Sequence, residues 1–427
     1  MSLLGLFSIN LISKIIVMAQ TTVEQELQRA DDGISIIALV DALLEQAYIS
    51  RASDIHIDPE EKRLRIRLRI DGVLHDSFIF PKEIQSEVIT RIKVLSGLRT
   101  DEHQAAQDGR FRTITKDKTP IDIRISITPT YYGENAALRL LVEKGEKFTL
   151  ESLGFSEKDL EKIMKAIKKP YGMILCTGPT GSGKTTTLYT ILKILNTKEI
   201  SIITIEDPIE YSIEGIDQIQ VNSRTSLTFA NGLRSILRQD PNIIMVGEIR
   251  DDETAAIAVN AALTGHLLLS TLHTNDAATT LPRLLDMKVE PFLIASTINI
   301  AIGQRLVRRI CSDCKIKKSL KDINELGKKT ITEIEFKSLN ESFGDKPFYQ
   351  GKGCNKCDGS GYFGRIGIHE VLEIDDNIRK AIINKADASE IQRLAIKNGM
   401  TPMLDDGFQK ALAGITTIEE ILRVIHE

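Results

Sequence analysis

The sequence predicts an α/β protein whose main domain holds a parallel sheet covered by helices on both faces. Four short, nearly unbroken apolar runs alternate with helix-compatible stretches between residues 173 and 269, which is typical of parallel strands buried on both sides. Earlier in the chain, two segments alternate strictly between polar and apolar residues, as half-buried strands do. The 427 residues exceed one ordinary core, so we expect two or three domains.

The composition is that of an ordinary globular protein. Apolar residues make up 42% of the chain and charged residues 27%, and 59 acidic against 55 basic side chains leave a net charge of -4. Because the chain has no overall positive field, direct nucleic-acid binding is not expected. Runs of about 18 uncharged apolar residues do not occur, so the sequence predicts no transmembrane helix.

Residues 1–34 are expected to form an N-terminal segment and a linker. Three interpretations of Leu3 to Met18 stay open: a terminal helix, an amphipathic helix at a membrane surface, or upstream sequence if translation starts at Met18. Residues 21–34 are mostly polar and acidic, as linkers often are.

Residues 35–143 are expected to form one small α/β domain. Ser35 is suited to cap a helix whose apolar residues recur at helical spacing up to Ile49. The first alternating segment, Arg63 to Ile70, places four arginines on one strand face, and Asp71-Gly72 follows as a turn signal. Pro81 opens a second helix. In the second alternating strand, Ile121 to Ile127, the isoleucines face a core while Asp122, Arg124 and Ser126 face away.

The rest of the chain divides into three expected parts. Residues 144–155 form a charged linker, and residues 156–310 form the domain of the parallel sheet. Its predicted strands are Met173 to Cys176, Ile202 to Ile205, Ile243 to Val246 and Leu267 to Leu269. Residues 311–427 are expected to hold a metal-binding element followed by a mainly helical region.

A phosphate-binding loop is the most specific motif. The run Gly178, Pro179, Thr180, Gly181, Ser182, Gly183, Lys184 and Thr185 fits G-x-x-x-x-G-K-[ST], between a buried strand and a helix that opens with Thr186. Its backbone N–H groups would surround phosphate oxygens at a helix N-terminus. Lys184 would reach the β and γ phosphates, and the Thr185 hydroxyl would bind Mg²⁺. The motif predicts a site for nucleotide phosphates.

Acidic and histidine side chains border two further strands of the predicted sheet. Glu248 follows the strand that ends at Val246, at the sheet edge where ligands bind, and is placed to orient the attacking water. Glu206 ends another strand and could bind Mg²⁺ directly or through water. His266 and His273 bracket a further strand, and each could sense the γ-phosphate or satisfy a local hydrogen bond.

Four of the five cysteines form two Cys-x-x-Cys pairs, which are Cys311 with Cys314 and Cys354 with Cys357. Four thiolates suit tetrahedral Zn²⁺, and a site filled by four protein ligands would be structural. The 39 residues between the pairs exceed ordinary zinc-ribbon spacing, so redox or free cysteines remain the alternative. Cys176 lies in a predicted strand and is expected to be a core residue.

Long motifs in a fixed order resemble the secretion ATPase superfamily, in its type II secretion and type IV pilus assembly branch. After the phosphate loop come Ile205-Glu206-Asp207-Pro208-Ile209-Glu210-Tyr211, Arg238-Gln239-Asp240-Pro241 with Gly247-Glu248-Ile249-Arg250-Asp251, and Thr264-Gly265-His266 with Ser270-Thr271-Leu272-His273-Thr274-Asn275-Asp276. These segments resemble the family's acidic, Walker B and histidine boxes, and the likeness extends over residues 35–427.

The resemblance implies a fold, cofactors and partners. It implies a RecA-like P-loop domain after a small, PAS-like α/β domain, with ATP, Mg²⁺ and Zn²⁺ bound. It implies a cytoplasmic homo-hexamer that works at the inner membrane with a platform protein and associates with the membrane through partners. It also implies that the N-terminal domain supplies arginines to the nucleotide, and the matching residues are Arg110, Arg124 and Arg139. Without the family, a surface ion pair of Arg124 with Asp122 or a neighbour would be the simpler interpretation.

The function expected from the resemblance is ATP hydrolysis coupled to type IV pilus assembly, in which pilins are extruded from the inner membrane. A type II secretion ATPase that drives pseudopilus assembly and protein export is the alternative. Two other classes remain: a DNA-uptake or nucleic-acid translocase motor, and a nucleotide-sensing adaptor that hydrolyses little. The family's assembly ATPases often carry a further N-terminal domain that docks to the membrane, whereas about thirty residues precede the first predicted helix here.

Overall fold

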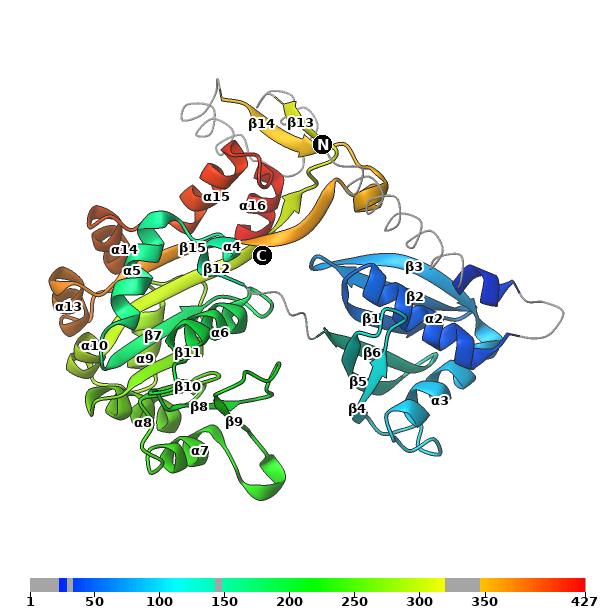
Figure 1. Cartoon of the computed structure of the whole chain (residues 1–427), viewed down its shortest axis with the longest axis horizontal. Coiled ribbons are helices and arrows are strands. Elements are labelled where there is room, and N and C mark those ends of the chain that lie inside the picture. The colour runs from blue at the N-terminus through cyan, green and yellow to red at the C-terminus, as the bar shows by residue number, and fades with distance from the viewer. Residues whose placement is uncertain (1–22, 29–33, 143–147, 319–345, 427) are drawn as a thin grey trace. The chain divides into compact units, whose positions relative to one another are not determined.

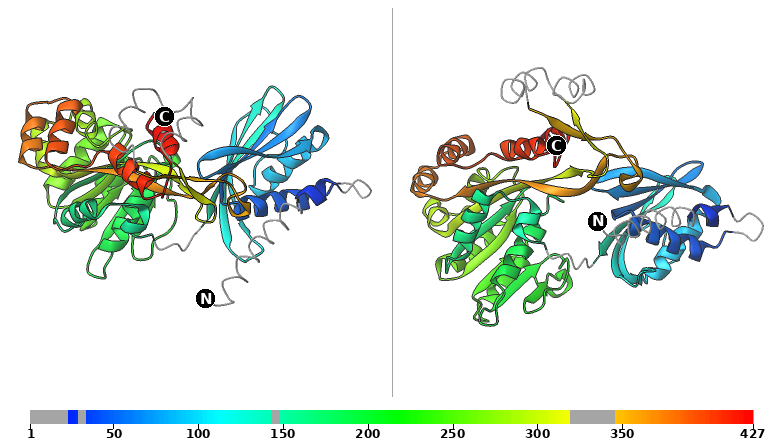
Figure 2. Two further views of the ribbon diagram at one scale, coloured as in Figure 1. Left: turned by 90° about the horizontal axis from the view of Figure 1, so that it is seen from above. Right: turned by 45° about the horizontal axis from the view of Figure 1, so that its top comes forward.

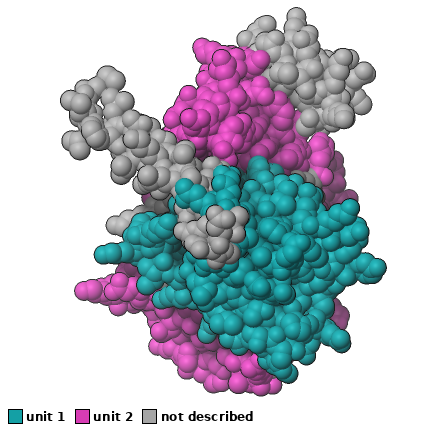
Figure 3. All heavy atoms as spheres, turned by 90° about the vertical axis from the view of Figure 1, so that its right-hand side faces the viewer, with its two compact units in different colours: residues 1–146 teal, residues 147–427 magenta. Residues whose placement is uncertain are grey.

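The computed structural model describes residues 23–28, 34–142, 148–318 and 346–426. Contacts divide the chain into two compact units, residues 1–146 and 147–427, which Figure 3 shows in two colours. Each unit is described by itself. The interpretations of Leu3 to Met18 fall on residues 1–22, outside the described residues.

The first unit is a six-stranded antiparallel sheet with two helices on one face (Figure 1). The strands are β1 (Ala52–Pro59), β2 (Arg63–Ile70), β3 (Val73–Pro81), β4 (Gln107–Ile114), β5 (Pro120–Thr130) and β6 (Gly133–Val142), and their order is β3-β2-β1-β6-β5-β4. The helices are α2 (Ile36–Ile49) and α3 (Gln85–Leu95), with the short 3₁₀ helix η1 (Lys82–Ile84) before α3.

The predicted elements of this unit are present. The side chain of Ser35 accepts a hydrogen bond from the Ala38 N–H and caps α2. The alternating segments became β2 and β5, whose apolar residues are buried beneath α2 and α3. The turn at Asp71-Gly72 joins β2 to β3, and both residues have positive φ. The helix expected after Pro81 begins with the turn η1 and continues as α3.

The second unit is built on a seven-stranded sheet in the order β15-β12-β7-β11-β10-β8-β9. The strands are β7 (Gly172–Thr177), β8 (Ile202–Glu206), β9 (Asp217–Gln220), β10 (Ile243–Val246), β11 (Leu267–Leu272), β12 (Ile298–Ile310) and β15 (Tyr362–Glu373). Six of them are parallel, and β15 joins as an antiparallel edge strand. The four predicted apolar runs are the central strands β7, β8, β10 and β11, and every residue in these strands is buried.

Helices cover both faces of this sheet, as predicted. Along β7 the side chains alternate, so that Met173 and Leu175 pack into one core and Ile174 and Cys176 into the other. The second core is completed by α4 (Leu150–Leu153), α5 (Glu157–Ile167) and α6 (Lys184–Leu195). The first is completed by α7 (Phe229–Ile236), α8 (Asp252–Leu263), α9 (Thr280–Asp286), α10 (Pro291–Thr297), α13 (Asp376–Ile383) and α14 (Ala388–Lys397). Cys176 is fully buried, as expected of a core residue.

The C-terminal region is joined closely to the large sheet. Strand β15 pairs along most of β12, and the two long strands run side by side in every view (Figures 1 and 2). The hairpin of β13 (Lys315–Lys318) and β14 (Phe348–Gly351), the turn η3 (Asn355–Cys357), and helices α15 (Met403–Leu412) and α16 (Ile418–His426) complete the unit. The boundary predicted at residue 310 therefore coincides with the end of β12, while the chain beyond it returns to the same sheet. Among the described residues, no helix has both the length and the apolar character needed to cross a bilayer.

Candidate functional site

The phosphate-loop residues lie between β7 and α6, at the carboxyl edge of the parallel sheet. Gly178, Gly181 and Gly183 all have positive φ, which side-chain-bearing residues rarely adopt. A Cβ on Gly178 would stand 2.3 Å from the backbone oxygen of Gln304, whereas around Gly181 nothing lies within 4 Å. The loop is therefore packed from behind by β12 and open at Gly181, which leaves room for phosphate groups over its backbone.

Lys184 is folded over this loop. Its Nζ donates to the backbone oxygens of Gly178, at 2.7 Å, and Pro179, at 3.1 Å. Burial lowers the pKa of Lys184, and the nearby charge of Glu248 acts in the opposite direction. Ser182 is also buried, and its Oγ has no hydrogen-bond partner in the structure. A buried cation next to an unsatisfied hydroxyl suits an anionic ligand with several oxygens, so the loop fits a nucleotide phosphate chain.

Gln304, which the sequence analysis did not single out, supports the loop from β12. Gly303 pairs with Thr177 in the parallel ladder of β12 and β7, and this register places Gln304 beside Gly178. Its Nε2 donates to the backbone oxygen of Ser182 at 2.6 Å, and its Oε1 accepts from the Thr187 hydroxyl at 2.8 Å. One buried amide thus joins the loop to the first turns of α6. No local pattern in the sequence distinguishes Gln304, because β12 also contains Asn299, Arg305 and Arg308.

Glu248 lies two residues beyond the end of β10. In the sheet, β10 is separated from β7 only by β11. Glu248 is 8% exposed, and its Oε2 lies 2.6 Å from Arg250 Nε and 3.1 Å from His273 Nε2. Both contacts are to the same oxygen. No hydrogen bond from the described residues reaches Oε1, so that oxygen remains available to a water molecule. The structure therefore brings together Glu248 and His273, which the sequence analysis had named separately.

Local contacts hold the two segments that carry Glu248 and His273, one after β10 and one after β11. Asp251, three residues after Glu248, accepts a hydrogen bond from the Thr254 N–H at 2.7 Å and caps α8. His273 follows the last residue of β11, and the next residue, Thr274, is tied to β7 because its N–H donates to Thr177 Oγ1 at 3.0 Å. The glutamate and the histidine therefore leave adjacent strands at the same edge.

Glu206 reaches the same edge but points into a hydrogen-bond network. It ends β8, is 2% exposed, and accepts from the hydroxyls of Thr204 and Tyr189 and from Gln218 Nε2. Burial raises the pKa of Tyr189, and the charge of Glu206 raises it further. Gly247 packs against the backbone of Glu206, with its Cβ position 3.3 Å from Glu206 Cα. The carboxylate is near Glu248 in the sheet, but its oxygens are already engaged by protein donors.

His266 lies at the opposite edge of the sheet from the phosphate loop. It precedes β11, whose first residue pairs with Gly172 and whose last pairs with Thr177. The six residues of β11 separate it from the loop by about 20 Å at ordinary strand rise. Its Nδ1 lies 3.0 Å from the backbone oxygen of Ala261. The structure therefore matches the local hydrogen bond that was one of the two interpretations of this histidine.

The three arginines assigned from the resemblance lie in the first unit and form one row. Arg124 on β5 pairs directly with Arg110 on β4 and with Arg139 on β6. Directly opposed residues share a face, and like charges in that arrangement repel each other, so the row favours an anion. Arg139 also donates to Asp54 at 3.0 Å. Asp122 accepts two hydrogen bonds from Arg112 at 2.9 and 2.7 Å.

The four cysteines of the two pairs form one cluster. Their Sγ atoms all lie within 4.8 Å of one another, and Cys311 to Cys354, Cys314 to Cys357 and Cys354 to Cys357 are separated by 3.8, 3.8 and 3.7 Å. Tetrahedral zinc with bonds of about 2.3 Å requires sulfur atoms about 3.8 Å apart. The cluster therefore fits a zinc ion.

Burial raises the pKa values of Cys311 and Cys314, whereas the backbone around Cys357 favours its thiolate. Burial acts to raise the pKa of Cys357, but the N–H groups of Cys354 and Gly361 each lie 3.2 Å from its sulfur, and the pKa is lowered to about 7. Glycines form a tight turn around the second pair of cysteines. A Cβ on Gly351 would meet the backbone oxygen of Gly361 at 2.1 Å, and one on Gly353 would meet that of Gly359 at 2.4 Å.

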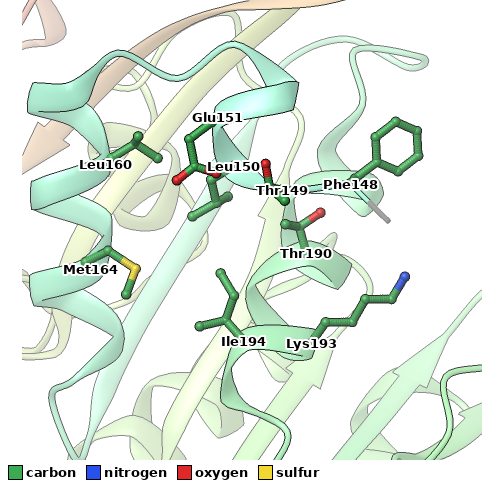
Figure 4. A pocket seen from close by; sticks show the side chains of 9 residues that line it. All are labelled: Phe148, Thr149, Leu150, Glu151, Leu160, Met164, Thr190, Lys193 and Ile194. Carbon is green, nitrogen blue, oxygen red and sulfur yellow. The ribbon is translucent and has the colours of Figure 1, made fainter. Parts of the chain in front are cut away.

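A separate hollow of about 370 Å³ lies between α4, α5 and α6 (Figure 4). Its lining includes the apolar side chains of Phe148, Leu160 and Met164, together with Lys193 and Ile194 from the last turns of α6. Lys184 begins that helix, so the hollow is at the other end of α6 from the phosphate loop. It contains none of the predicted site residues.

Comparison with known sequences extends over nearly the whole chain. The family model "Type II/IV secretion system protein" matches residues 28–423. The type IV pilus assembly ATPase PilB of Thermus thermophilus is 46% identical over 385 residues, which are 90% of this chain but only 42% of that protein. The type II secretion system protein E of Pseudomonas aeruginosa is 44% identical over 404 residues, which are 94% of this chain and 78% of that protein.

Solved structures agree at the level of the fold. The pilus retraction motor PilT, determined with bound ADP, is 26% identical with a TM-score of 0.59, and the match covers 90% of this chain and 96% of that one. The ATPase DotB of Legionella pneumophila is 23% identical with a TM-score of 0.66, and covers 94% and 98%. The resemblance inferred from the motifs is thereby confirmed, and the chain belongs to the family of type II/IV secretion system proteins.

Proposed function

We propose that the chain is an ATPase that hydrolyses Mg·ATP at the 178–185 loop and uses the resulting movement to assemble pilin subunits into a type IV pilus. The observation that carries the ATPase assignment is the position of Glu248. It leaves the sheet beside the phosphate loop, is held by Arg250 and His273 through one oxygen, and keeps the other oxygen for a water. Relatives named for pilus assembly and for type II secretion support the wider assignment.

Each residue of the nucleotide site has a separate role in hydrolysis. The loop amides and Lys184 bind the phosphates and stabilise the charge that develops on them. Glu248 Oε1 orients the attacking water and accepts its proton, and His273 fixes the glutamate. Thr185 and Glu206 would hold Mg²⁺, which neutralises phosphate charge. For that role Glu206 must exchange a contact with Thr204, Tyr189 or Gln218 for the ion or its water.

The first unit would complete the site with the row of Arg110, Arg124 and Arg139. Three guanidinium groups on one sheet face supply the positive charge that a phosphoryl transition state attracts. Its antiparallel sheet with helices on one face supports a PAS-like arrangement. In this proposal the chain acts as a cytoplasmic homo-hexamer, peripheral at the inner membrane, with a platform protein as its partner. The cysteine cluster holds a structural zinc ion.

The test of the ATPase assignment is Glu248→Gln. This change keeps the shape of the side chain but removes its basicity, so turnover should fall by about 10²- to 10⁴-fold while ATP still binds. Glu253→Gln is the matched control, because Glu253 lies five residues on, is exposed, and pairs with Arg234 on the surface. Turnover of Glu248→Gln equal to that of the control would overturn the assignment.

Type II secretion is the second candidate, since protein E relatives match as well as pilus ATPases do. Recovery of partners from crosslinked membranes distinguishes the two: pilins with a platform protein support pilus assembly, and pseudopilins support secretion. A nucleic-acid motor is disfavoured by the net charge of -4. Strong stimulation of the ATPase by DNA would reverse that order.

A further inference from the structure

Glu370 is a buried carboxylate outside the motifs that the family resemblance uses. It lies on β15 opposite Gly303 of β12, and it is 3% exposed. Its Oε1 accepts from the N–H of Ala277 at 2.7 Å, and its Oε2 accepts from the N–H of Met403 at 3.2 Å. One side chain thus binds two backbone segments that are far apart in the sequence.

The first of these segments is the loop that follows β11. It begins with His273, which contacts Glu248, and continues with Thr274, which is tied to Thr177 just before the phosphate loop. Ala277 is fully buried at the end of this loop. The loop that carries His273 is therefore held to β7 at Thr274 and to β15 at Ala277, through Glu370.

The second segment is the first turn of α15. Met403 is the first residue of this helix, and Pro402 before it provides no side-chain cap. The N–H groups of a first turn have no partner within the helix, and a carboxylate there also interacts favourably with the helix dipole. Glu370, on β15, accepts a hydrogen bond from this first turn and also places its carboxylate at the positive end of the helix dipole. A further bond, from the His369 N–H to Asp406 Oδ2 at 2.8 Å, holds the same helix to the same strand.

The packing leaves little freedom for this carboxylate. A Cβ on Gly303 would lie 2.9 Å from Glu370 Oε1 and 3.0 Å from the Ala277 nitrogen. Only a glycine at that position allows the side chain and the loop to approach each other. The contact of Glu370 with Ala277 therefore depends on a residue of β12 as well as on the glutamate itself.

We propose that Glu370 is a positioning residue for ATP hydrolysis: it holds the Thr274–Ala277 loop, and with it His273, in place against Glu248, and it joins that loop to the start of α15. Glu370 touches neither the phosphate loop nor Glu248 and acts through the histidine loop. The inference rests on the proposed function, since it concerns the rate of that reaction.

Glu370→Gln is the primary variant, with Glu373→Gln as its control. The amide keeps one acceptor oxygen, so one of the two backbone N–H groups loses its partner. The kcat for ATP is expected to fall about 10- to 100-fold, because catalytic geometry is sensitive to displacements of about 1 Å. KM should stay within about twofold, since the phosphate loop is unchanged. Glu373 lies on the same strand, pairs with exposed Lys165, and should tolerate the same change.

Gly303→Ala tests the same contact from the opposite side, and should lower kcat in the same way by displacing the carboxylate from Ala277. Combining Glu370→Gln with His273→Ala tests whether Glu370 acts through His273. If Glu370 acts through His273, the double variant is no slower than His273→Ala alone, whereas independent effects multiply. Amide hydrogen exchange of peptides containing Ala277 and Met403 should accelerate in Glu370→Gln and not in Glu373→Gln.

The outcomes separate the inference from the function on which it rests. If the parent chain hydrolyses ATP and both variants keep its kcat, the inference is wrong and the proposed function stands. Faster exchange with unchanged kcat would reduce Glu370 to a structural residue and also overturn the inference. If the parent chain itself does not hydrolyse ATP, the proposed function fails, and the catalytic role of Glu370 fails with it.

Discussion

Replacement of Gln304 by leucine tests how the phosphate loop is supported. Leucine has similar size but no polar atoms, so the change removes the donor to the Ser182 backbone oxygen and the acceptor for the Thr187 hydroxyl. Both groups are buried, and Gln304 itself is 1% exposed. Water therefore cannot readily replace the lost partner.

The expected magnitude follows from these two contacts. A buried polar group left without its partner costs about 1 to 3 kcal/mol, which gives about 2 to 6 kcal/mol for the pair. The Thr187 hydroxyl can turn to the Gly183 carbonyl four residues earlier, which recovers only part of its cost, so we expect a total loss of about 2 to 3 kcal/mol, at the lower end of that range. At about 2 to 4 °C per kcal/mol, the Tm of the second unit should fall by about 4 to 12 °C. A loosened loop should also bind ATP about tenfold more weakly, which corresponds to about 1.4 kcal/mol.

Calorimetry and ATP titration measure both effects. Gln409→Leu is the control, because Gln409 is exposed on α15 and the same chemical change there should cost less than about 0.5 kcal/mol. A Gln304→Leu protein that melts within about 1 °C of the control and binds ATP equally well would refute the reasoning, since a loss of 2 kcal/mol predicts a larger shift.

Two further changes concern the cysteine cluster and acid stability. Metal analysis should find one zinc ion per chain in the parent and in Cys176→Ala but not in Cys357→Ser, and retention of zinc in Cys357→Ser would contradict the site. Burial acts to raise the pKa of Glu420, but Arg308 and Arg423 donate to its carboxylate and lower the pKa from 4.5 to about 2. Glu420 therefore stabilises the fold above about pH 4.5, and roughly 3 kcal/mol of unfolding free energy is lost as the pH falls toward 2. In urea unfolding, Glu420→Gln should lose less stability over that range, and an equal loss in both proteins would argue against the effect.

Local patterns in the sequence were enough to predict the central strands and the phosphate loop. The apolar runs at β7, β8, β10 and β11 identify strands that are buried on both faces, because such strands have no polar side to expose. The strict alternation in β2 and β5 likewise identifies a sheet with one covered face. Four further strands of the first unit, β1, β3, β4 and β6, were not predicted from the sequence.

The sequence predicted the charged residues of the candidate site better than it predicted how those residues are arranged. Glu248 and His273 follow strand ends that the sequence reveals, and the carboxyl ends of parallel strands must meet at one edge. His266 shares the same motif, but a residue before a strand lies at the other edge. The network around Glu206 depends on Tyr189 from α6 and Gln218 from β9, which no local pattern joins.

By itself, therefore, the sequence determined the nucleotide loop, the glutamate beside it, the paired cysteines and the class of fold, because each depends on residues close together in the chain. Only the tertiary structure decided which distant side chains support them. Gln304 and Glu370 are buried polar residues within long strands, and their partners are selected by the pairing of β12 with β7 and of β15 with β12. The same pairing brings β15, from beyond the cysteines, into the sheet that carries the phosphate loop. Strand register is set by the packing of the whole sheet, so such contacts leave no mark in the local sequence.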